Sequence, residues 1–586
     1  MTRIASDPPA AHPPLRVMLG ITVALAIAFA CITASYYLFG SDSARYVELG
    51  RSLARGEGYF YFGAPERAFP PGFPALLALA NLLLGESFAT SARWAALISA
   101  LVFPAAWAFA RTRTAALPIA LLTVSSVGFL EIVIGNPRSE PIYMVGSLGL
   151  LAWAYWGAMR PESSRPSAPY IAAGTMLLLI TVATRSIGIA AVGAVAMVLL
   201  ERIVRPVPGA RRFPPEIAIP LGAGVVFLVL WFAWTRSNAK LESATGAGSS
   251  YVRHLLLLDP HRPELGGVSP LALLIRVLRN LVVQLGHAAE LLTQLPWIKP
   301  RWFSPFTATM AALTVAGVVN ELRRPTRLGA WYVMGYGVIL LLWPYDEGTR
   351  FLVPILPLLW VFALVGARRA TAALSEGSRP FRLGLIAAGG VSVLGALVSL
   401  RSAPDDFSRQ DQAFVMAWLV VLGIAVFGWR KAQAWTSAAS SRFGRPVLIG
   451  ALVLYAAAGA ARVAPSVAAQ FRGTSLTDPV TAALQEASRW INGNAPPEAT
   501  TQASFPAPLL FATRRKTVKF PATSSPEQLR ESIETHRPDF LVVLNDTDNP
   551  YYQPVDSEKF GIVQKLFPGA WREVARLKGS TIYAFR

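Results

Sequence analysis

The sequence predicts an all-α polytopic membrane protein with about thirteen membrane-spanning helices, followed by a small C-terminal α/β domain. Hydrophobic residues make up 53% of the 586 residues and charged residues only 15%, whereas a soluble domain carries roughly 25% charged residues. Apolar runs close to the roughly 20 residues that cross a bilayer recur over most of the chain. From residue 465 onward these runs give way to short helix, strand and turn patterns.

The basic excess of the chain fits a membrane protein better than a nucleic-acid-binding one. The net charge is +20, from 54 Lys and Arg against 34 Asp and Glu. Much of the excess is arginine in short loops between apolar runs, where positive charge orients helices. No basic patch interleaved with aromatic residues follows residue 465, so no nucleic acid is expected as a partner. The single cysteine, Cys31, excludes an internal disulfide.

The N-terminal part of the chain is expected to consist of a tail, one span and a long loop. Residues 1–14 are rich in proline and are expected to form a disordered cytoplasmic tail. The first span follows at about 15–38, and residues 39–88 form the first outer loop. Within this loop the apolar segment 75–85 is short for a crossing, so we expect an interfacial or re-entrant helix.

The remaining spans complete a membrane domain over residues 15–464. A second long outer loop, 236–301, contains an expected amphipathic helix near Pro270–Leu295. The other spans are expected at about 89–110, 115–134, 141–158, 169–184, 186–203, 216–235, 303–320, 329–344, 351–367, 383–400, 412–429 and 446–464.

Arginine-rich loops alternate with loops poor in charge, and this alternation predicts the orientation. The rich loops are expected to be cytoplasmic, and they include Arg111/Arg113, Arg160/Arg165, Arg202/Arg205/Arg211/Arg212, Arg323/Arg324/Arg327, Arg368/Arg369/Arg379/Arg382 and Arg430/Lys431/Arg442/Arg445. An odd number of spans then places the N-terminus in the cytoplasm and the C-terminal domain outside it.

Residues 465–586 are expected to form a small extracytoplasmic α/β domain. Thr477-Asp478-Pro479 and Ser525-Pro526-Glu527 are each typical of a helix start, with a capping residue before proline. Phe540–Leu544 is typical of a buried strand, and the segments on either side of Lys578-Gly579-Ser580 indicate a hairpin.

Candidate functional residues gather on the expected outer side of the membrane. Ionisable residues at this depth are costly to insert and therefore informative, and they are Asp42, Arg138, Glu140, Arg185, Asp346, Glu347 and Arg350. A carboxylate at the membrane surface can act as general base on an acceptor hydroxyl or amine. Nearby arginines can hold a phosphate without losing their charge.

Each of these residues also has an ordinary structural explanation. Asp42 lies where a helix cap is expected, and Glu140 precedes a proline at a helix start. The arginines can anchor helix ends by extending to the interface, and Asp346 with Glu347 can form a plain polar loop. The five histidines show no metal-ligand spacing, so no metal site is predicted.

Several short motifs occur in an order that resembles a known family. They are Asp42-Ser43-Ala44-Arg45-Tyr46, Leu53-Ala54-Arg55-Gly56-Glu57-Gly58-Tyr59, Pro70-Pro71-Gly72-Phe73-Pro74, Arg138-Ser139-Glu140-Pro141, Thr184-Arg185 and Arg350-Phe351-Leu352-Val353-Pro354. Over roughly residues 15–365 this order resembles the GT-C membrane glycosyltransferases, in the branch of protein O-mannosyltransferases and lipid A aminoarabinose transferases.

The resemblance implies a glycosyltransferase that takes a sugar from a polyprenyl-phosphate donor to an extracytoplasmic lipid, glycan or protein acceptor. Asp42 would be the catalytic base of an inverting transfer, and Glu140 would shape the acceptor side. The resemblance assigns the donor phosphate to Arg138, Arg185 and Arg350, and loop 236–301 to closure over the donor. The remaining substrate-binding residues it implies are Arg45, Tyr46, Lys240, Tyr251, His254 and Asp346.

One departure from the family pattern bears on the mechanism. The first loop often has two adjacent acidic residues in this branch, whereas here Asp42 is followed by Ser43. A single carboxylate favours a single-base scheme, so no cofactor is expected and a divalent cation has no support. High Ala, Arg and Pro content suggests a bacterium, whose inner membrane would then hold the protein.

Two other function classes stay open. A transporter or flippase for lipid-linked sugars predicts pseudo-symmetric halves and ionisable residues near mid-membrane. A non-catalytic assembly protein predicts that Asp42 is dispensable. The collection of ionisable residues on one side and the large outer loop favour the enzyme.

Overall fold

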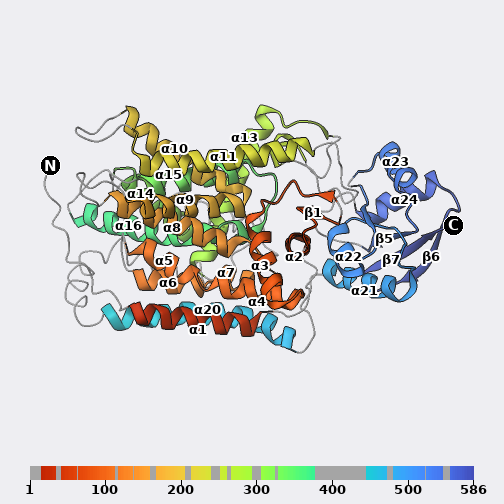
Figure 1. Ribbon diagram of the computed structural model, residues 1–586, viewed down its shortest axis with the longest axis horizontal. Helices are drawn as coiled ribbons and strands as arrows, with labels where there is room; N and C mark the ends of the chain where they lie inside the picture. The colour runs from red at the N-terminus through yellow and green to blue at the C-terminus, as the bar shows by residue number, and fades with distance from the viewer. Residues whose placement is uncertain are drawn as a thin grey trace.

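The computed structural model describes most of the chain, in fifteen segments. They are residues 15–33, 41–62, 64–111, 116–135, 137–158, 167–204, 213–238, 251–259, 265–293, 305–323, 327–375, 444–471, 479–521, 523–545 and 555–586. The predicted tail 1–14 and the predicted spans at 383–400 and 412–429 lie outside the described residues. Long helices run side by side, and the sheet domain lies at one end of the bundle, here called the domain end (Figure 1).

The bundle is built from apolar helices, as predicted. Its helices are α1 (Leu15–Ile32), α4 (Phe88–Ser99), α5 (Val102–Ala110), α6 (Ala116–Val124), α7 (Val127–Ile134), α8 (Glu140–Ala158), α9 (Ala168–Thr184), α10 (Ile189–Val204), α11 (Pro215–Ser237), α14 (Pro305–Glu321), α15 (Leu328–Leu342), α16 (Leu356–Ser375) and α20 (Gly444–Phe471). Within the described residues, six stretches are long and apolar enough to cross a membrane, or seven if one bent pair counts as a span. One of the six is Pro270–Leu292, which the sequence predicts as an amphipathic helix of the outer loop and not as a span. The chain is a multi-pass membrane protein, but the described helices do not confirm thirteen spans.

Two predicted spans are each broken into two helices. The span expected at 89–110 is α4 and α5, and the span expected at 115–134 is α6 and α7, bent by 50°. Serines explain the second break. The Ser125 Oγ donates to the Leu121 carbonyl at 2.7 Å, and the Ser126 Oγ accepts from the Phe129 amide at 3.3 Å. The Ser126 side chain thus bonds an amide in the first turn of α7 that has no helical partner, whereas the Ser125 hydroxyl adds a second bond to the Leu121 carbonyl, which already accepts the Ser125 amide.

The first loop folds into a compact unit at the domain end. It contains α2 (Ser41–Ala54), a short hairpin of β1 (Phe60–Tyr61) and β2 (Ala64–Pro65), and α3 (Gly72–Leu84). The short apolar helix expected at 75–85 is α3. Its first residue, Gly72, packs so closely on α9 that an added Cβ would lie 2.7 Å from the Ala183 carbonyl oxygen. The Pro70–Pro74 motif therefore seats the first loop directly against the end of α9.

Replacing Gly72 by alanine is expected to lower stability by about 1–3 kcal/mol, because the new methyl group meets backbone that has to shift. The shift would also displace Arg185, which follows α9. Thermal unfolding of the purified protein measures the first effect. Gly222→Ala is a matched control, because an added Cβ there meets nothing within 4 Å. Equal melting temperatures for the two variants would contradict the close contact.

The amphipathic helix expected near Pro270–Leu295 is α13 (Pro270–Thr293). Its polar side chains bond residues that end or follow α15. The Asn280 Nδ2 donates to the Leu341 and Trp343 carbonyls at 2.9 and 2.6 Å, and the His287 Nε2 lies 2.8 Å from the Asp346 Oδ1. This helix therefore packs against the domain end of α15.

The C-terminal part is an α/β domain, as expected. Its elements are α21 (Pro479–Asn494), β3 (Thr501–Ala503), α22 (Pro506–Thr513), β4 (Thr517–Lys519), α23 (Pro526–His536), β5 (Phe540–Leu544), α24 (Asp556–Leu566), β6 (Trp571–Arg576) and β7 (Ser580–Phe585). The sheet order is β4-β3-β5-β7-β6, with β3 parallel to β4 and β5, and β7 antiparallel to β5 and β6. The predicted boundary at 465 falls inside α20, which continues to Phe471, so the sheet domain begins with α21.

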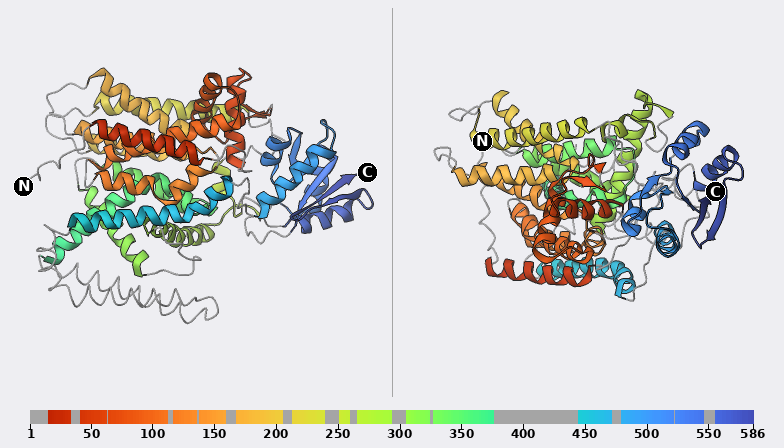
Figure 2. Two further views of the ribbon diagram at one scale, coloured as in Figure 1. Left: turned by 90° about the horizontal axis from the view of Figure 1, so that it is seen from below. Right: turned by 45° about the vertical axis from the view of Figure 1, so that its right-hand side comes forward.

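The sheet domain lies at the same end of the bundle in two further views (Figure 2). It docks on the first loop through α22, which lies beside α2 (Figure 1). Phe511 of α22 is only 6% exposed and joins the hydrophobic cluster of Tyr46 and Phe73. The Tyr61 hydroxyl donates to the Ala507 carbonyl at 3.1 Å. Since α2 belongs to both this interface and the membrane domain, the two domains meet on the helix that carries Asp42.

Candidate active site

Charged residues from four parts of the chain meet at the domain end. Asp42 lies in the first turn of α2, Arg138 and Glu140 lie at the start of α8, Arg185 lies between α9 and α10, and Arg350 lies in a 3-10 turn, η3 (Gly348–Phe351). Helix ends leave backbone groups unpaired, and polar side chains gather there. Five predicted site residues are thus brought together, and with Glu347 they form the carboxylate–arginine cluster.

Glu140 is the buried centre of this cluster. Its side chain has no exposed surface, and its Oε1 accepts from the Arg350 Nε and lies 2.7 Å from the Arg185 Nη1. A buried carboxylate without a partner is very costly, so two guanidinium groups are needed to hold it ionised. Its Oε2 is buried and has no hydrogen-bond partner among the described residues. One oxygen of Glu140 therefore has no donor among the described residues and can accept a hydrogen bond.

Asp42 is the accessible carboxylate of the cluster. Its side chain is 34% exposed, and its Oδ2 accepts from the Arg350 Nη2 at 2.7 Å. Burial is the largest influence on the pKa of Asp42 and raises it, but the Arg350 charge and hydrogen bond, together with the Arg138 charge, hold the pKa below its usual value. Arg350 therefore bridges Asp42 and Glu140 and keeps Asp42 ionised.

Arg138 is the free cation of the cluster. Among the described residues, no hydrogen bond or ion pair engages its guanidinium group. Burial and the neighbouring Arg350 charge lower the pKa of Arg138, and the Glu140 and Asp42 charges oppose them. An arginine stays charged throughout the working pH range, so Arg138 offers a full set of donors for an anion.

Behind these groups, a buried layer sets the position of Arg185. The Arg185 Nη1 donates to the Ser139 Oγ at 3.3 Å, and the Tyr46 hydroxyl lies 3.0 Å from the same oxygen. The Arg185 guanidinium also lies over the Phe351 ring, 5.6 Å from its centroid. Tyr46, 3% exposed, thus contacts the cluster from behind.

Two adjacent carboxylates separate at the turn after α15. Asp346 bonds the His287 Nε2 at 2.8 Å and the Gly348 amide at 2.9 Å. Glu347 instead faces the cluster, with its Oε2 3.8 Å from the Arg350 Nη1. Burial and the Asp42 charge raise the pKa of Glu347, and the Arg350 charge opposes them. Glu347 and Asp42, which both contact Arg350, therefore have pKa values shifted in opposite directions.

Other predicted substrate-binding residues lie apart from the cluster. Arg45 forms a two-pronged ion pair with Glu66, at 2.7 Å between its Nη2 and the Glu66 Oε2, and lies over the Phe69 ring. Glu66 also accepts the backbone amides of residues 67–69 and so holds the first loop in shape. The substrate role of Arg45 stays a prediction.

The long-loop candidates are only partly described. Lys240 and the side chain of Tyr251, the first residue of α12 (Tyr251–Leu256), lie outside the described residues. The His254 ring packs on Trp343 and Tyr345, and its Nδ1 lies 3.5 Å from the Tyr345 hydroxyl. His254 is therefore tied to the segment between α15 and Arg350, which links the loop to the cluster.

Ser139 and Glu66 have contacts at or near the site but no predicted role, and Glu347 is a sequence candidate without an assigned role. Glu347 precedes Arg350 by three residues, a spacing that brings side chains together on one helical turn. Ser139 carries no such signal, since only the packing of Tyr46 and Arg185 gives it partners. Within the described residues, no group of three or more His, Cys, Asp and Glu side chains could hold a metal ion.

Solved structures share this architecture. ArnT of Cupriavidus metallidurans, a lipid A aminoarabinose transferase, bound to undecaprenyl phosphate, superposes with a TM-score of 0.53 and 16% identity over 97% of this chain and 98% of its own. Apo ArnT superposes with a TM-score of 0.54 and 16% identity over 98% of both chains. The oligosaccharyltransferase of Archaeoglobus fulgidus, tethered with an acceptor peptide, has a TM-score of 0.49 and 11% identity over 98% of this chain and 74% of its own.

These likenesses concern the fold. No protein-family model matches the chain, and no curated protein matches it. The likeness to ArnT extends over almost the full length of both chains. The chain therefore has the GT-C fold, as the order of its motifs over residues 15–365 predicted, and the likeness extends to the C-terminal domain.

Proposed function

We propose that this protein is a GT-C glycosyltransferase that moves a sugar from a polyprenyl-phosphate donor to an acceptor outside the cytoplasm. The observation that carries the proposal is that an accessible carboxylate, Asp42, and a free arginine, Arg138, belong to one charged cluster at one end of a membrane bundle. The undecaprenyl phosphate bound by ArnT supports the donor class, because that protein shares the fold. The N-terminus would be cytoplasmic and the C-terminal domain periplasmic, in a bacterial inner membrane.

In this proposal, Asp42 accepts the proton of the acceptor. The acceptor oxygen bonds to the anomeric carbon while the bond from that carbon to the phosphate oxygen breaks. The hydroxyl proton passes to Asp42, and the bonding electron pair leaves with the phosphate. Attack opposite the leaving group inverts the anomeric centre. Because Arg350 lowers the pKa of Asp42, the carboxylate is a weak base that takes the proton late, as the hydroxyl becomes acidic in the transition state.

The arginines stabilise the leaving group. The donor phosphate carries one negative charge as a diester and gains a second when the sugar leaves. Arg138 and the Nη1 of Arg350 are the groups that face this developing charge, and donors fixed in advance are effective at such a position. Arg185 is held by Glu140 and Ser139, so its role is to position Glu140. No metal is needed for this scheme.

The proposal is tested by turnover in proteoliposomes. Undecaprenyl phosphates carrying different labelled sugars are supplied with the purified protein and a crude envelope extract as acceptor. Cleavage of the sugar–phosphate bond with label on an acceptor supports the transferase. Movement of intact donor across the bilayer without cleavage would instead indicate a flippase.

Replacing Arg138 by glutamine is expected to raise the donor KM about 10–100-fold, because a charge-assisted hydrogen bond contributes about 1.5–3 kcal/mol. The measurement is initial rate against donor concentration. Arg138→Lys should recover part of the loss, since it restores the charge without the planar fork. Arg369→Gln is the matched control, because Arg369 is an exposed arginine bonded to Asn320 on α14, outside the cluster. An unchanged KM in Arg138→Gln would remove Arg138 from donor binding.

A further inference from the structure

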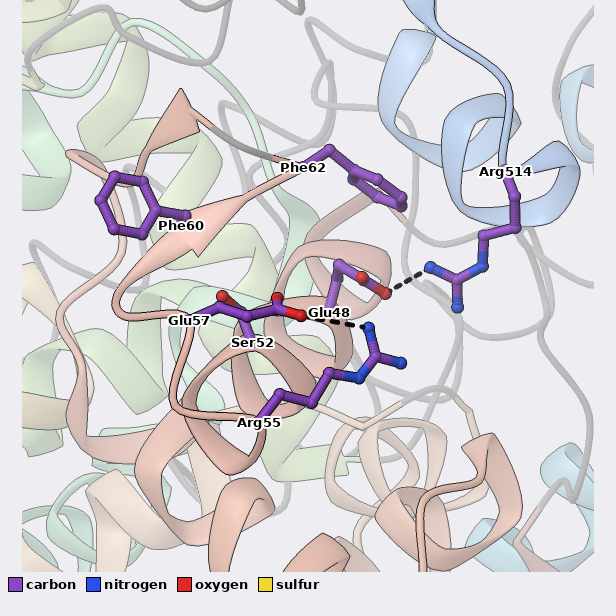
Figure 3. A pocket seen from close by; sticks show the side chains of 7 residues that line it. All are labelled: Glu48, Ser52, Arg55, Glu57, Phe60, Phe62 and Arg514. Atoms are coloured by element: carbon purple, nitrogen blue, oxygen red, sulfur yellow. Dashed lines mark hydrogen bonds and ion pairs between the residues drawn. The ribbon is translucent and has the colours of Figure 1, made fainter. Parts of the chain in front are cut away.

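A cavity of about 400 Å³ lies where the first loop meets the C-terminal domain. Figure 3 shows α2 and the β1 hairpin on one side and Arg514, at the end of α22, on the other. Ligand pockets in proteins span roughly 300–1,000 Å³, so the cavity has room for a small ligand. It belongs to neither domain alone, and it is distinct from the carboxylate–arginine cluster.

The charges that line the cavity cancel. Glu48 and Glu57 supply two carboxylates, and Arg55 and Arg514 supply two guanidinium groups. The Glu48 side chain is only 8% exposed and lies 2.6 Å from the Arg514 Nη1. A phosphate or other polyanion would meet these carboxylates without a surplus of positive charge. A polyhydroxylated ligand would suit both kinds of group, because each hydroxyl both donates and accepts hydrogen bonds.

Aromatic rings complete the lining. Phe60 and Phe62 both border the cavity, and Phe62 is 36% exposed. The Phe62 backbone has a φ of 46°, in the left-handed region that disfavours residues with a side chain. A phenylalanine held there, with its ring partly in solvent and 5.4 Å from the Arg514 guanidinium, is the kind of strained residue found at ligand clamps. The ring offers a flat apolar platform beside the polar groups.

The position of the cavity relates it to the cluster. Glu48 follows Asp42 by six residues on α2, which corresponds to about 9 Å along the helix. Arg514 of the C-terminal domain lines the cavity, whereas Arg350 contacts Asp42 at the start of α2, so the cavity and the cluster share this helix.

We infer that this cavity is a subsite for an uncharged sugar unit of the acceptor, with Phe62 as its stacking platform and Glu57 as a hydrogen-bond partner. That the ligand belongs to the acceptor rests on the proposed function. That the ligand is an uncharged sugar rests on the cavity itself. It makes the acceptor a neutral glycan and not a phosphorylated one. It also gives the C-terminal domain a role, because Arg514 closes one wall.

Binding to a glycan array tests the subsite. The purified full-length protein in nanodiscs is applied to neutral glycans and to phosphorylated glycans printed at equal density. We expect binding to neutral glycans, reduced at least tenfold in Phe62→Ala and in Glu57→Gln. Both side chains are partly or largely exposed, so these variants should fold. Phe585→Ala is the matched control, because Phe585 is 42% exposed on the last strand of the sheet domain, and it should bind like wild type.

Three results would overturn the inference: binding to phosphorylated glycans alone, neutral-glycan binding that both variants retain, or no glycan binding by protein that unfolds cooperatively. Donor cleavage measured on the same samples separates the two proposals. Glycan binding that depends on Phe62 without any donor cleavage would sink the proposed function and leave the subsite standing. Donor cleavage together with glycan binding that does not depend on Phe62 would overturn the subsite and leave the proposed function standing.

Discussion

Replacing Asp42 by asparagine is expected to slow sugar transfer about 10²–10⁴-fold, the usual contribution of a general base. Asparagine keeps the shape of the side chain at this position in the first turn of α2, but it cannot take the acceptor proton. The measurement is the single-turnover rate of label transfer from undecaprenyl-phosphate sugar in proteoliposomes. Donor KM should change little, because Arg138 and Arg350 remain.

A second carboxylate of the same cluster provides the comparison for Asp42. Glu347→Gln removes a group that also lies against Arg350, at 3.8 Å, and should slow transfer far less. Equal melting temperatures for both variants would show that neither has lost its fold. Wild-type rates in Asp42→Asn would exclude the single-base mechanism, and donor binding without turnover in all forms would favour the flippase or assembly functions.

Replacing Arg350 by glutamine is expected to damage both stability and rate. Arg350 bridges Asp42 and the fully buried Glu140, and breaking a buried ion pair costs about 3–5 kcal/mol. Arg185 still holds Glu140 at 2.7 Å, so the loss should lie near the lower end of that range. Transfer should fall as well, because the leaving phosphate loses a cation. Thermal unfolding and transfer rates measure the two effects.

The pH dependence of transfer isolates the electrostatic role of Arg350. In the wild type Arg350 holds the pKa of Asp42 below 3.8, so the rate should stay level down to about pH 4, near the ordinary aspartate pKa. Without Arg350, burial dominates and raises this pKa, so the acid limb of the profile should move to higher pH. The base is active when ionised, which gives the sign of the shift. An unmoved acid limb in Arg350→Gln would contradict the pairing with Asp42.

Arg350→Lys gives a conservative comparison. Lysine restores the charge but cannot contact both carboxylates through a planar fork. The acid limb should return toward the wild-type position while the melting temperature recovers only in part. Recovery of both would mean that charge alone, without the bridge, accounts for Arg350.

The sequence by itself determined the class of the protein and the composition of much of its site. Apolar runs and their lengths predicted the bundle, and α3 and α13 lie where the short and the amphipathic apolar segments were expected. Five site residues come together because all of them lie at helix ends on one side of the bundle, which loop charges and span lengths reveal. The C-terminal sheet followed from local turn and strand signals.

Only the tertiary structure decided which charges pair. Asp346 and Glu347 are neighbours in sequence, yet one bonds His287 and the other faces Arg350. Arg45 forms an ion pair with Glu66, whereas Arg138 has no ion pair among the described residues. The breaks within two predicted spans, the continuation of α20 past residue 465 and the docking of Phe511 were also invisible in the chain.

The physical reason for this division is the range of the forces involved. Helix formation and membrane insertion depend on composition over one continuous segment, which a sequence displays directly. Ion pairing and domain docking depend on distances of a few ångströms between segments hundreds of residues apart, as between Asp42 and Arg350 or Glu48 and Arg514. Those distances are set by the packing of every helix in between, which no local pattern records.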